Sequence, residues 1–318
     1  MSPAPVASCR VLEIGCSDGG NLIPMAYALP GARFLGVDLA DSAIAAASGT
    51  AAALDLRNIA FEAADLRDIG ARHGEFDYII AHGLYSWIPP DIRDRLLAIC
   101  RERLAPQGIC FVSYNTLPGG YTRQMMREML LYPTRSIEAP ERRVEQAREF
   151  LRYLLEKKSV SAGWTALLES EVQTMLKRDG SGLFHDDLAP VNDFVYFRDF
   201  AAHAQRHGLQ FLGESEPAQL ADPGNVLQWL DAGVVEREQY IDFLRLRRFR
   251  QTLLCREEVA LDRNMDSTRM DRFLFSAPAR PMGENQMEGY HGARITVTHD
   301  AARRLCASFA RHPSWEGF

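Results

Sequence analysis

The sequence of 318 residues lacks the features of several common protein classes. It has no CxxC pair, which argues against a zinc site and a disulfide framework and fits a reducing compartment. No apolar run approaches the roughly 18 residues of a membrane span, and no charged start precedes a hydrophobic segment as in a secretory signal. The six cysteines are scattered: Cys9, Cys16, Cys100, Cys110, Cys255 and Cys306. We therefore expect a cytoplasmic protein without a membrane span.

Basic residues are also fewer than acidic ones: the chain has 36 lysines and arginines and 42 acidic residues, and its formal net charge is −6. This balance argues against a general nucleic-acid binder, so no nucleic-acid partner is expected. The basic stretch 245–250 (RLRRFR) is accordingly predicted to be an exposed helix face beside a strand. His185, Asp186 and Asp187 are adjacent rather than spaced as ligands on a helix, which favours a helix cap over a metal site. We expect no metal.

The first 120 residues alternate between predicted strands and helices. The strands are expected at 10–14, 33–37, 59–63, 76–81 and 109–114, the last after a turn at 106–108. Helices are expected after an Asn21 cap, from Asp41 or Ser42 to Ala53, and over 90–104. Such alternation with short turns predicts an α/β fold with a parallel sheet covered on both faces. Ligands bind such sheets beyond the carboxyl ends of the strands.

The alternation stops beyond Tyr121. Amphipathic helices are predicted over 123–132, 141–158 and 161–178, a linker over 179–182, and a helix ending at 207. A helix over 234–250 lies between two further predicted strands, 209–213 and 251–255. We predict that these strands complete a Rossmann-like sheet of seven strands. The helices would then form an insertion between strands five and six, near the ligand end of the sheet.

The segment VLEIGCSDGGN, residues 11–21, follows the first strand and lacks one glycine of each cofactor fingerprint that it approaches. The dinucleotide pattern GxGxxG matches at Gly15 and Gly20, with Ser17 in the middle position. The GxGxG pattern of S-adenosylmethionine enzymes matches at Gly15 and Gly19, again with Ser17 between them. Counting glycines therefore leaves both cofactors open.

The acidic residues near this turn favour S-adenosylmethionine. Glu13 and Asp18 would repel a pyrophosphate at the helix N-terminus, whereas they suit the ammonium and the sulfonium of S-adenosylmethionine. Asp38, at the end of the second strand, can accept both ribose hydroxyls, and Asp65, at the end of the third, is placed to accept the adenine amino group. Taken alone, Glu13 or Asp65 fits a capping or solvated acid equally well. Together the acids predict S-adenosylmethionine as the cofactor.

The loop 81–90 (AHGLYSWIPP) follows the fourth strand and is predicted to face the sulfonium. Tyr85 and Trp87 would line a channel for the methyl acceptor, because their faces suit a cation. Tyr85 or His82 would accept or relay the proton that the acceptor must lose. The alternative is that Trp87 packs against the prolines that follow it.

A second loop, 113–121 (SYNTLPGGY), follows the fifth strand. Asn115 and Tyr114 would hydrogen-bond the acceptor, and the alternative is that Asn115 bonds its own backbone. The predicted catalytic residues are thus Tyr85, Trp87, Asn115 and His82. The predicted cofactor site comprises Glu13, Gly15, Cys16, Ser17, Gly19, Asn21, Asp38, Leu39, Asp65, Leu66, His82 and Gly83.

These motifs resemble those of class I methyltransferases, with EIGCSDGG as the glycine motif, GVDL and AADL as acidic strand ends, and APQG as the turn before the fifth strand. The strings CRVLEIGCSDGGNLIPMAYALPGARFLGVDL, AHGLYSWIP, SYNTLPG and FRQTLLCR resemble a bacterial group that joins this domain to a methyltransferase regulatory domain. Its best-known members are rickettsial protein lysine methyltransferases that modify an outer-membrane protein. The resemblance covers almost the whole chain. It implies methylation of a protein side chain, lysine first. The alternatives are a small-molecule O- or N-methyltransferase and a non-catalytic regulatory protein that binds the cofactor.

The resemblance also implies an organisation in four parts. Residues 1–120 would form the cofactor-binding core, 121–200 a helical lid, substrate selector or homodimer contact, 201–260 the last core strands and regulatory region, and 261–318 a C-terminal segment. Residues 296–311 (TVTHDAARRLCASFAR) resemble the start of the family's winged-helix region. The family's lead-in before the first strand is short here, which predicts weakened cofactor binding. A fragment, a short isoform and a divergent member all remain open as interpretations.

Overall fold

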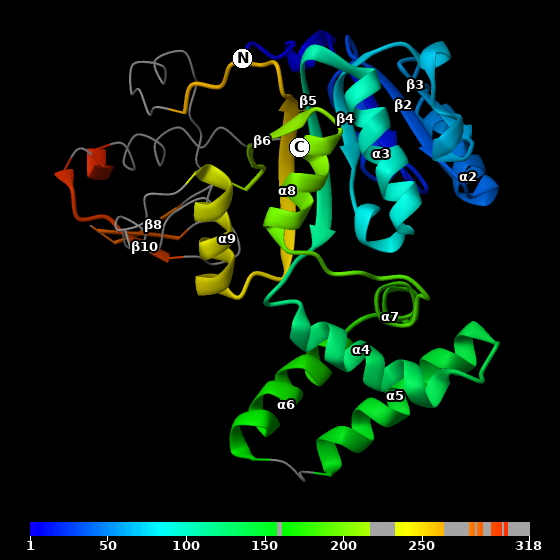
Figure 1. Cartoon of the computed structure of the whole chain (residues 1–318), viewed down its shortest axis with the longest axis vertical. Coiled ribbons are helices and arrows are strands. Elements are labelled where there is room, and N and C mark those ends of the chain that lie inside the picture. The colour runs from blue at the N-terminus through cyan, green and yellow to red at the C-terminus, as the bar shows by residue number, and fades with distance from the viewer. Residues whose placement is uncertain are drawn as a thin grey trace. The chain divides into compact units, whose positions relative to one another are not determined.

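Seven strands of the chain form one mixed sheet in the order β3-β2-β1-β4-β5-β7-β6 (Figure 1). The computed structural model describes residues 1–157, 161–216, 233–263, 280–283, 285–288, 294–300 and 302–304. The chain divides into two compact units, Met1–Leu261 and Asp262–Phe318, and the large sheet belongs to the first. The Rossmann-like sheet of seven strands predicted from the sequence is confirmed. Among the described helices, none combines the length and the apolar character needed to cross a membrane.

The strands of the large sheet, β1 to β7, span Arg10–Ile14, Arg33–Asp38, Ile59–Ala63, Phe76–Ala81, Leu104–Asn115, Leu209–Glu214 and Phe249–Arg256. Helices α1 to α9 span Leu22–Ala28, Asp41–Ala53, Pro90–Arg103, Tyr121–Thr134, Pro140–Glu156, Ala162–Leu176, Gly180–Asp187, Phe197–Arg206 and Val234–Arg245. Short 3-10 turns η1 to η4 span Val6–Ser8, Leu66–Asp68, Ala71–His73 and Tyr85–Trp87. In the second unit, β8 (Arg280–Gly283), β9 (Gln286–Glu288) and β10 (Arg294–Thr296) form an antiparallel sheet. Half of the predicted winged-helix start, residues 301 and 305–311, lies outside the described residues.

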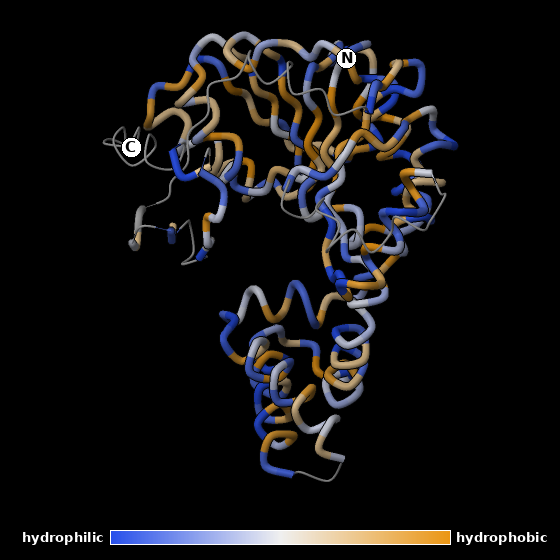
Figure 2. Tube along the Cα trace, turned by 90° about the vertical axis from the view of Figure 1, so that its left-hand side faces the viewer, coloured by the Kyte–Doolittle hydropathy of each residue, from blue (hydrophilic) through white to orange (hydrophobic). Residues whose placement is uncertain are grey.

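Helices cover both faces of the parallel part of the sheet, as its apolar strands require. Alternate residues of β1 point to opposite faces, so Val11 packs in the cluster that contains α1, and Leu12 packs in the cluster that contains α3 and α8. Strand β7 runs antiparallel to both β5 and β6. Figure 2 shows the hydrophobic residues concentrated along the strands. Neighbouring strands among β1 to β5 pair in parallel, so their carboxyl ends meet at one edge of the sheet.

The turn predicted at 106–108 proved to be an irregular part of β5. Leu104 pairs with Phe76 and Ile109 pairs with Tyr78, so four residues of β5 face a single residue of β4. Gly108 is required at this point, because a Cβ there would lie 2.9 Å from the carbonyl oxygen of Asp77. The extra residues are accommodated within the strand, which the composition of the segment did not reveal.

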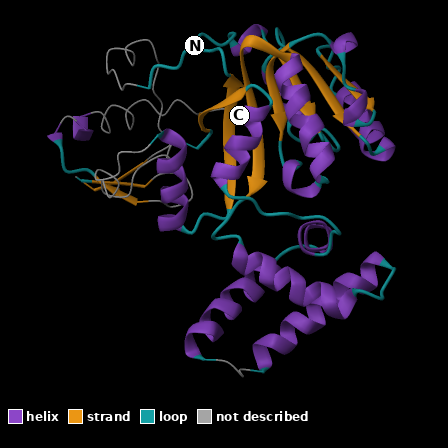
Figure 3. Ribbon diagram, in the orientation of Figure 1, coloured by secondary structure: helices purple, strands orange, loops and turns teal. Residues whose placement is uncertain are grey.

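Helices α4 to α7 form the predicted insertion between β5 and β6, beyond the carboxyl end of β5 (Figure 3). The insertion has its own apolar core of Met126, Leu130, Ala147, Leu151, Val172, Met175, Leu183 and Leu188. The predicted linker at 179–182 is wrong, because Asp179 caps α7 by accepting a hydrogen bond from the Gly182 N–H at 2.6 Å. The predicted helix cap at 185–187 is also wrong. Those residues form the last turn of α7, and the buried Asp187 pairs with Arg123 at 2.5 Å.

The basic stretch 245–250 is not the exposed helix face that the sequence predicts. Helix α9 ends at Arg245, because Leu246 adopts a left-handed conformation with φ of 47°. Arg250 lies on β7 and is fully buried among the carboxylates of Glu214 (2.5 Å), Asp242 (2.9 Å) and Glu238 (3.0 Å). Its guanidinium also lies 3.8 Å from the ring centroid of Phe197. Glu238 and Asp242 come from α9, and Glu214 comes from β6, 36 residues before Arg250.

Replacing Arg250 with Met is expected to lower the free energy of unfolding by roughly 3–5 kcal/mol, because three buried carboxylates lose their shared cation. Urea unfolding monitored by circular dichroism measures the change. Arg237→Met is the control, since Arg237 is an exposed cation on the neighbouring helix, and its effect should stay within about 0.5 kcal/mol. Equal stability of the two variants would contradict a structural role for the buried cluster.

Candidate functional site

The turn between β1 and α1 depends on two glycines with positive φ. Gly15 has φ of 76° and Gly19 has φ of 78°, a region that side chains with a Cβ rarely adopt. A Cβ at Gly19 would also lie 2.7 Å from the ring of Phe61. The N–H groups of Gly15 and Cys16 both donate to the carbonyl of Val37, at 2.8 and 3.2 Å. These bonds fix the turn against the end of β2.

Ser17 occupies the position where both cofactor fingerprints have a glycine. It adopts a positive φ of 49°, so it takes the conformation that the missing glycine would have. Its N–H donates to Oδ2 of Asp38 at 2.8 Å, and Oδ1 of Asp38 accepts from the Ala40 N–H at 2.9 Å. Asp38 is therefore held in place by the backbone on both sides.

Glu13 contributes a buried carboxylate with one unpartnered oxygen. Its side chain is 3% exposed, and burial raises its pKa to about 7. Oε1 accepts a hydrogen bond from Nδ2 of Asn21 at 2.8 Å, whereas Oε2 has no partner. Asn21 occupies the N-cap position of α1, but its side chain makes the bond to Glu13 and no capping bond. An uncompensated buried acceptor of this kind fits a cationic ligand.

A cavity of about 280 Å³ opens at the carboxyl ends of β1, β2 and β3. It is lined by Ile14, Gly15, Val37, Asp38, Leu39, Ala64, Asp65, Leu66, Arg67, Leu84, Ile88, Pro89 and Ile92. Five predicted cofactor residues are among them, and the apolar walls suit a flat ring. Asp65 caps η2, as one of the two interpretations expected, and Arg67 binds both of its oxygens. The hydrogen bonds from Arg67 lower the pKa of Asp65 to about 2.

His82 and Gly83 follow β4 and share one partner on β5. Oγ of Ser113 lies 3.0 Å from Nδ1 of His82 and accepts from the Gly83 N–H at 2.8 Å. Ser113 was not among the predicted site residues, although its position near the carboxyl end of β5, the strand beside β4, is the feature that indicates it. His82 and Asn21 also line a second cavity, of about 550 Å³, along the face of β1, β4, β5 and β7.

Tyr85 and Tyr114 lie in the protein core instead of lining a channel. Tyr85 is 3% exposed, and its hydroxyl lies 2.8 Å from Nδ1 of His203. Burial raises the pKa of Tyr85 to about 12, so the phenol stays protonated and no tyrosinate is present to take a proton from an acceptor. Tyr114 is fully buried, and its hydroxyl lies 3.0 Å from Oγ1 of Thr252. Tyr85 lies in η4, after β4, as the sequence predicts, whereas Tyr114 lies within β5 and not in the loop after it.

Trp87 and Asn115 connect the two loops predicted to face the acceptor to the insertion. The Trp87 ring stacks on His185 of α7 with a centroid distance of 5.4 Å, and its indole N–H is buried without a partner. Nδ2 of Asn115 donates to Oδ1 of Asn192 at 2.8 Å, so Asn115 does not bond its own backbone. Both residues therefore lie where α7 meets the carboxyl edge of the sheet.

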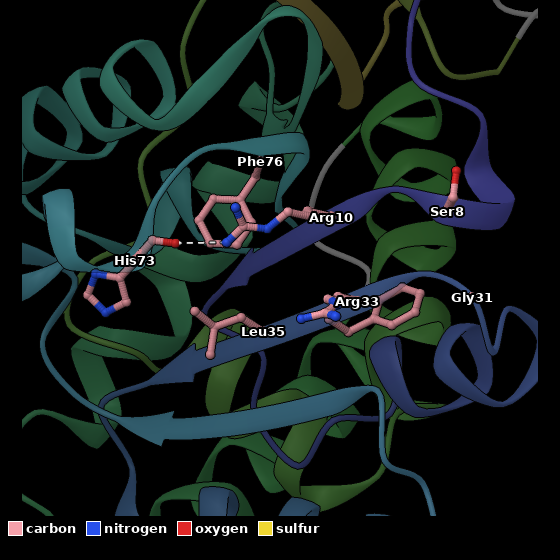
Figure 4. A pocket seen from close by; sticks show the side chains of 8 residues that line it. Ser8, Arg10, Gly31, Arg33, Leu35, His73 and Phe76 are labelled. Carbon is pink, nitrogen blue, oxygen red and sulfur yellow. Dashed lines mark hydrogen bonds between the residues drawn. The ribbon is translucent and has the colours of Figure 1, made fainter.

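A further cavity, of about 560 Å³, lies at the opposite, amino-terminal ends of the strands (Figure 4). Arg10 and Arg33 are register partners on β1 and β2, and both line it together with His73. The Arg10 guanidinium donates to the carbonyl of His73 at 3.1 Å and lies 5.2 Å from the ring centroid of Phe76. Since ligands of parallel sheets bind at the carboxyl ends, we assign the candidate site to the other edge.

Two segments of the chain match models of known protein families. Residues 12–110 match the model of a methyltransferase domain, and residues 179–256 match that of a predicted methyltransferase regulatory domain. The chain is 36% identical to the uncharacterised protein RP789 of Rickettsia prowazekii, over 88% of this chain and 52% of the relative. It is 30% identical to RP028 of the same organism, over 67% of this chain and 85% of the relative.

The structure is also similar to PKMT2 from Rickettsia typhi, with a TM-score of 0.84 and 29% identity, over 98% of this chain and 63% of that one. PKMT2 in complex with AdoHcy matches with a TM-score of 0.85 and 28% identity, over 98% of this chain and 64% of that one. The chain thus spans about half to two thirds of the length of RP789 and PKMT2.

Glu13 gives a prediction about stability and pH. Its pKa is about 7 in the folded protein, above its ordinary value of 4.5, so the stability it contributes is present below about pH 4.5 and is lost as the pH rises through 7. Glu13→Gln should therefore be more stable than the native chain near pH 8, by up to about 3 kcal/mol, and nearly equal to it near pH 4.5. Urea unfolding at several pH values measures this difference.

Glu62→Gln is the matched control, because Arg72 and His73 lower the pKa of Glu62. That variant should gain no stability at any pH. A Glu13→Gln variant that is less stable than the native chain near pH 8 would contradict the interpretation that the Glu13 carboxylate is buried without a compensating partner.

Proposed function

The chain belongs to the class I S-adenosylmethionine-dependent methyltransferases that carry a methyltransferase regulatory domain, and from this premise we propose that it methylates a protein side chain, lysine first. The two matched segments and the relatives in Rickettsia support the proposal. The lysine acceptor rests on the resemblance of the loop strings to rickettsial protein lysine methyltransferases. A cytoplasmic location and a homodimer remain predictions.

The unpartnered Oε2 of Glu13 is the observation that carries the cofactor assignment. An ammonium at that oxygen would complete the hydrogen bonding of a carboxylate that Asn21 binds on one side only. A pyrophosphate at the same place would add negative charge beside a buried acid. The residues present therefore fit the methionyl end of S-adenosylmethionine and disfavour a dinucleotide.

The other strand ends fit the nucleoside. Each oxygen of Asp38 accepts one backbone hydrogen bond and keeps a lone pair for a ribose hydroxyl. The cavity beside Leu39, Leu66 and Ile88 has apolar walls for the adenine. Asp65 is held by Arg67, so we assign it to the rim of this cavity and propose that it contacts the amino group of adenine.

S-adenosylmethionine supplies an electrophilic methyl group, and the protein must align the acceptor and remove its proton. We propose that Nε2 of His82 accepts the proton that the acceptor loses. Nε2 is unprotonated in the tautomer in which Nδ1–H of His82 donates to Oγ of Ser113. Trp87 would contact the acceptor with its face or its unpartnered N–H. Asn115 would position the edge of the insertion through its bond to Asn192.

Cofactor binding gives the next prediction. Asp38→Ala should weaken binding of S-adenosylhomocysteine by about 1–3 kcal/mol, the range for losing hydrogen bonds to a charged group. Isothermal titration calorimetry measures the change. Asp41→Ala is the control, since Asp41 is an exposed acid at the start of α2. Tighter binding of NAD than of S-adenosylhomocysteine by the native chain would overturn the cofactor assignment.

The acceptor class is tested with methyl-labelled S-adenosylmethionine and bacterial lysate. We expect the label on protein, in acid hydrolysates as methyllysine, and label recovered only in small molecules would contradict the proposal. Trp87→Ala and His82→Ala should each reduce the label by about 100-fold or more while cofactor affinity stays within about twofold. Tyr85→Phe is the control, because its hydroxyl faces His203. Unchanged labelling by both variants would exclude this loop from the active site.

A further inference from the structure

Three side chains with metal-ligand chemistry converge on the face of the sheet that α3 and α8 cover. Asp94 belongs to α3, and His203 and His207 lie on α8 and at its C-cap. Oδ1 of Asp94 is 2.9 Å from Nε2 of His203 and 3.0 Å from Nε2 of His207. These three atoms lie within 4.8 Å of one another. The two histidines are four residues apart, so they share one face of the helix.

We propose that Asp94, His203 and His207 bind a divalent transition-metal ion, Zn²⁺ first. Imidazole nitrogen and carboxylate oxygen are common ligands of Zn²⁺, at about 2.0–2.2 Å. In a tetrahedral site, ligand atoms at that distance from the metal lie about 3.3 Å apart. The two N···O separations observed here need to lengthen by only a few tenths of an ångström. A set of two nitrogens and one oxygen favours zinc, copper or nickel over Mg²⁺ or Ca²⁺.

Tyr85 supplies the outer contact that metal-binding histidines usually make. Its hydroxyl lies 2.8 Å from Nδ1 of His203, the ring nitrogen that faces away from the cluster. When Nε2 binds the metal, Nδ1 carries the proton and donates it to the oxygen of Tyr85, which fixes the ring. Tyr85 is packed against Tyr114 and Phe200, so this contact is rigid.

The ion would connect the two matched segments of the chain. Asp94 lies in the segment that matches a methyltransferase domain, and both histidines lie in the segment that matches a regulatory domain. Arg93, next to Asp94, donates from Nε to the carbonyl of Tyr85 at 2.8 Å, so α3 also holds the loop that carries Trp87. The side chain of Asp94 is 59% exposed, which leaves a coordination position open to water. Three protein ligands and an open position are fewer than the four protein ligands of a closed structural zinc site, so the site suits an exchangeable, regulatory ion.

The test uses the whole chain after treatment with a chelator. Titration with Zn²⁺ and with Co²⁺ should show one ion per chain, a Co²⁺ absorption band in the visible range and a raised melting temperature. His207→Ala and Asp94→Asn should abolish all three signals, and circular dichroism should show that both variants are folded. Tyr85→Phe keeps the three ligands and should bind about tenfold more weakly, as expected for loss of an outer-shell contact.

Asp91→Asn is the matched control, because Asp91 is an exposed acid on the same helix outside the cluster. It should bind the ion like the native chain. Absence of binding by the native chain would mean that Asp94 merely accepts two hydrogen bonds from the histidines, and it would overturn the proposal. Equal binding by His207→Ala would also overturn it, since the ion would then lie elsewhere, for example on cysteines.

Discussion

The hydrogen bonds between the turn after β1 and the end of β2 determine the geometry of the whole cofactor edge. The carbonyl of Val37 accepts from Gly15 and Cys16, and Asp38 accepts from Ser17. Asp38 therefore has two roles. It holds Ser17 in its left-handed conformation, and it is the acid proposed to bind the ribose. A carboxylate already fixed by the backbone loses little conformational entropy when a ligand binds. The turn and the ligand site are therefore one structural unit.

Polar contacts connect this edge to the helical insertion. Oγ of Ser86 accepts from the backbone N–H of Asn115 at 2.8 Å, and its carbonyl accepts from the Asp193 N–H at 2.8 Å. Asp193 is bound in turn by Arg93 of α3, at 2.6 Å. Ser86 therefore joins the loop after β4, the end of β5 and the end of the insertion, and Arg93 joins α3 to the same place through Asp193. A change in the position of the insertion would reach Asn115 through these bonds and Trp87 through its stacking on His185 of α7.

The sequence indicated the elements of the sheet and the ends of its strands, because periodicity and turn residues are local signals. It also placed Glu13, Asp38 and Asp65 at one edge, since parallel strands align their carboxyl ends. It could not show which way the side chains within a strand, or in the turn that follows a strand, point. Tyr85 and Tyr114 were therefore expected to face an acceptor, and both lie in the core. The prediction for 245–250 was wrong because the helix ends at Arg245 and Arg250 lies on β7, where pairing with β6 brings Glu214 to it from 36 residues away.

The central claim is that the buried carboxylate of Glu13 binds the ammonium of the cofactor. Calorimetry with S-adenosylhomocysteine and with its desamino analogue, which keeps the carboxylate but lacks the ammonium, tests it most directly. The native chain should bind the analogue at least about tenfold more weakly, and Glu13→Gln should bind the two ligands almost equally, as a double-mutant cycle requires for a direct interaction. A native chain that does not distinguish the two ligands, or a Glu13→Gln variant that distinguishes them as strongly as the native chain, would contradict the claim.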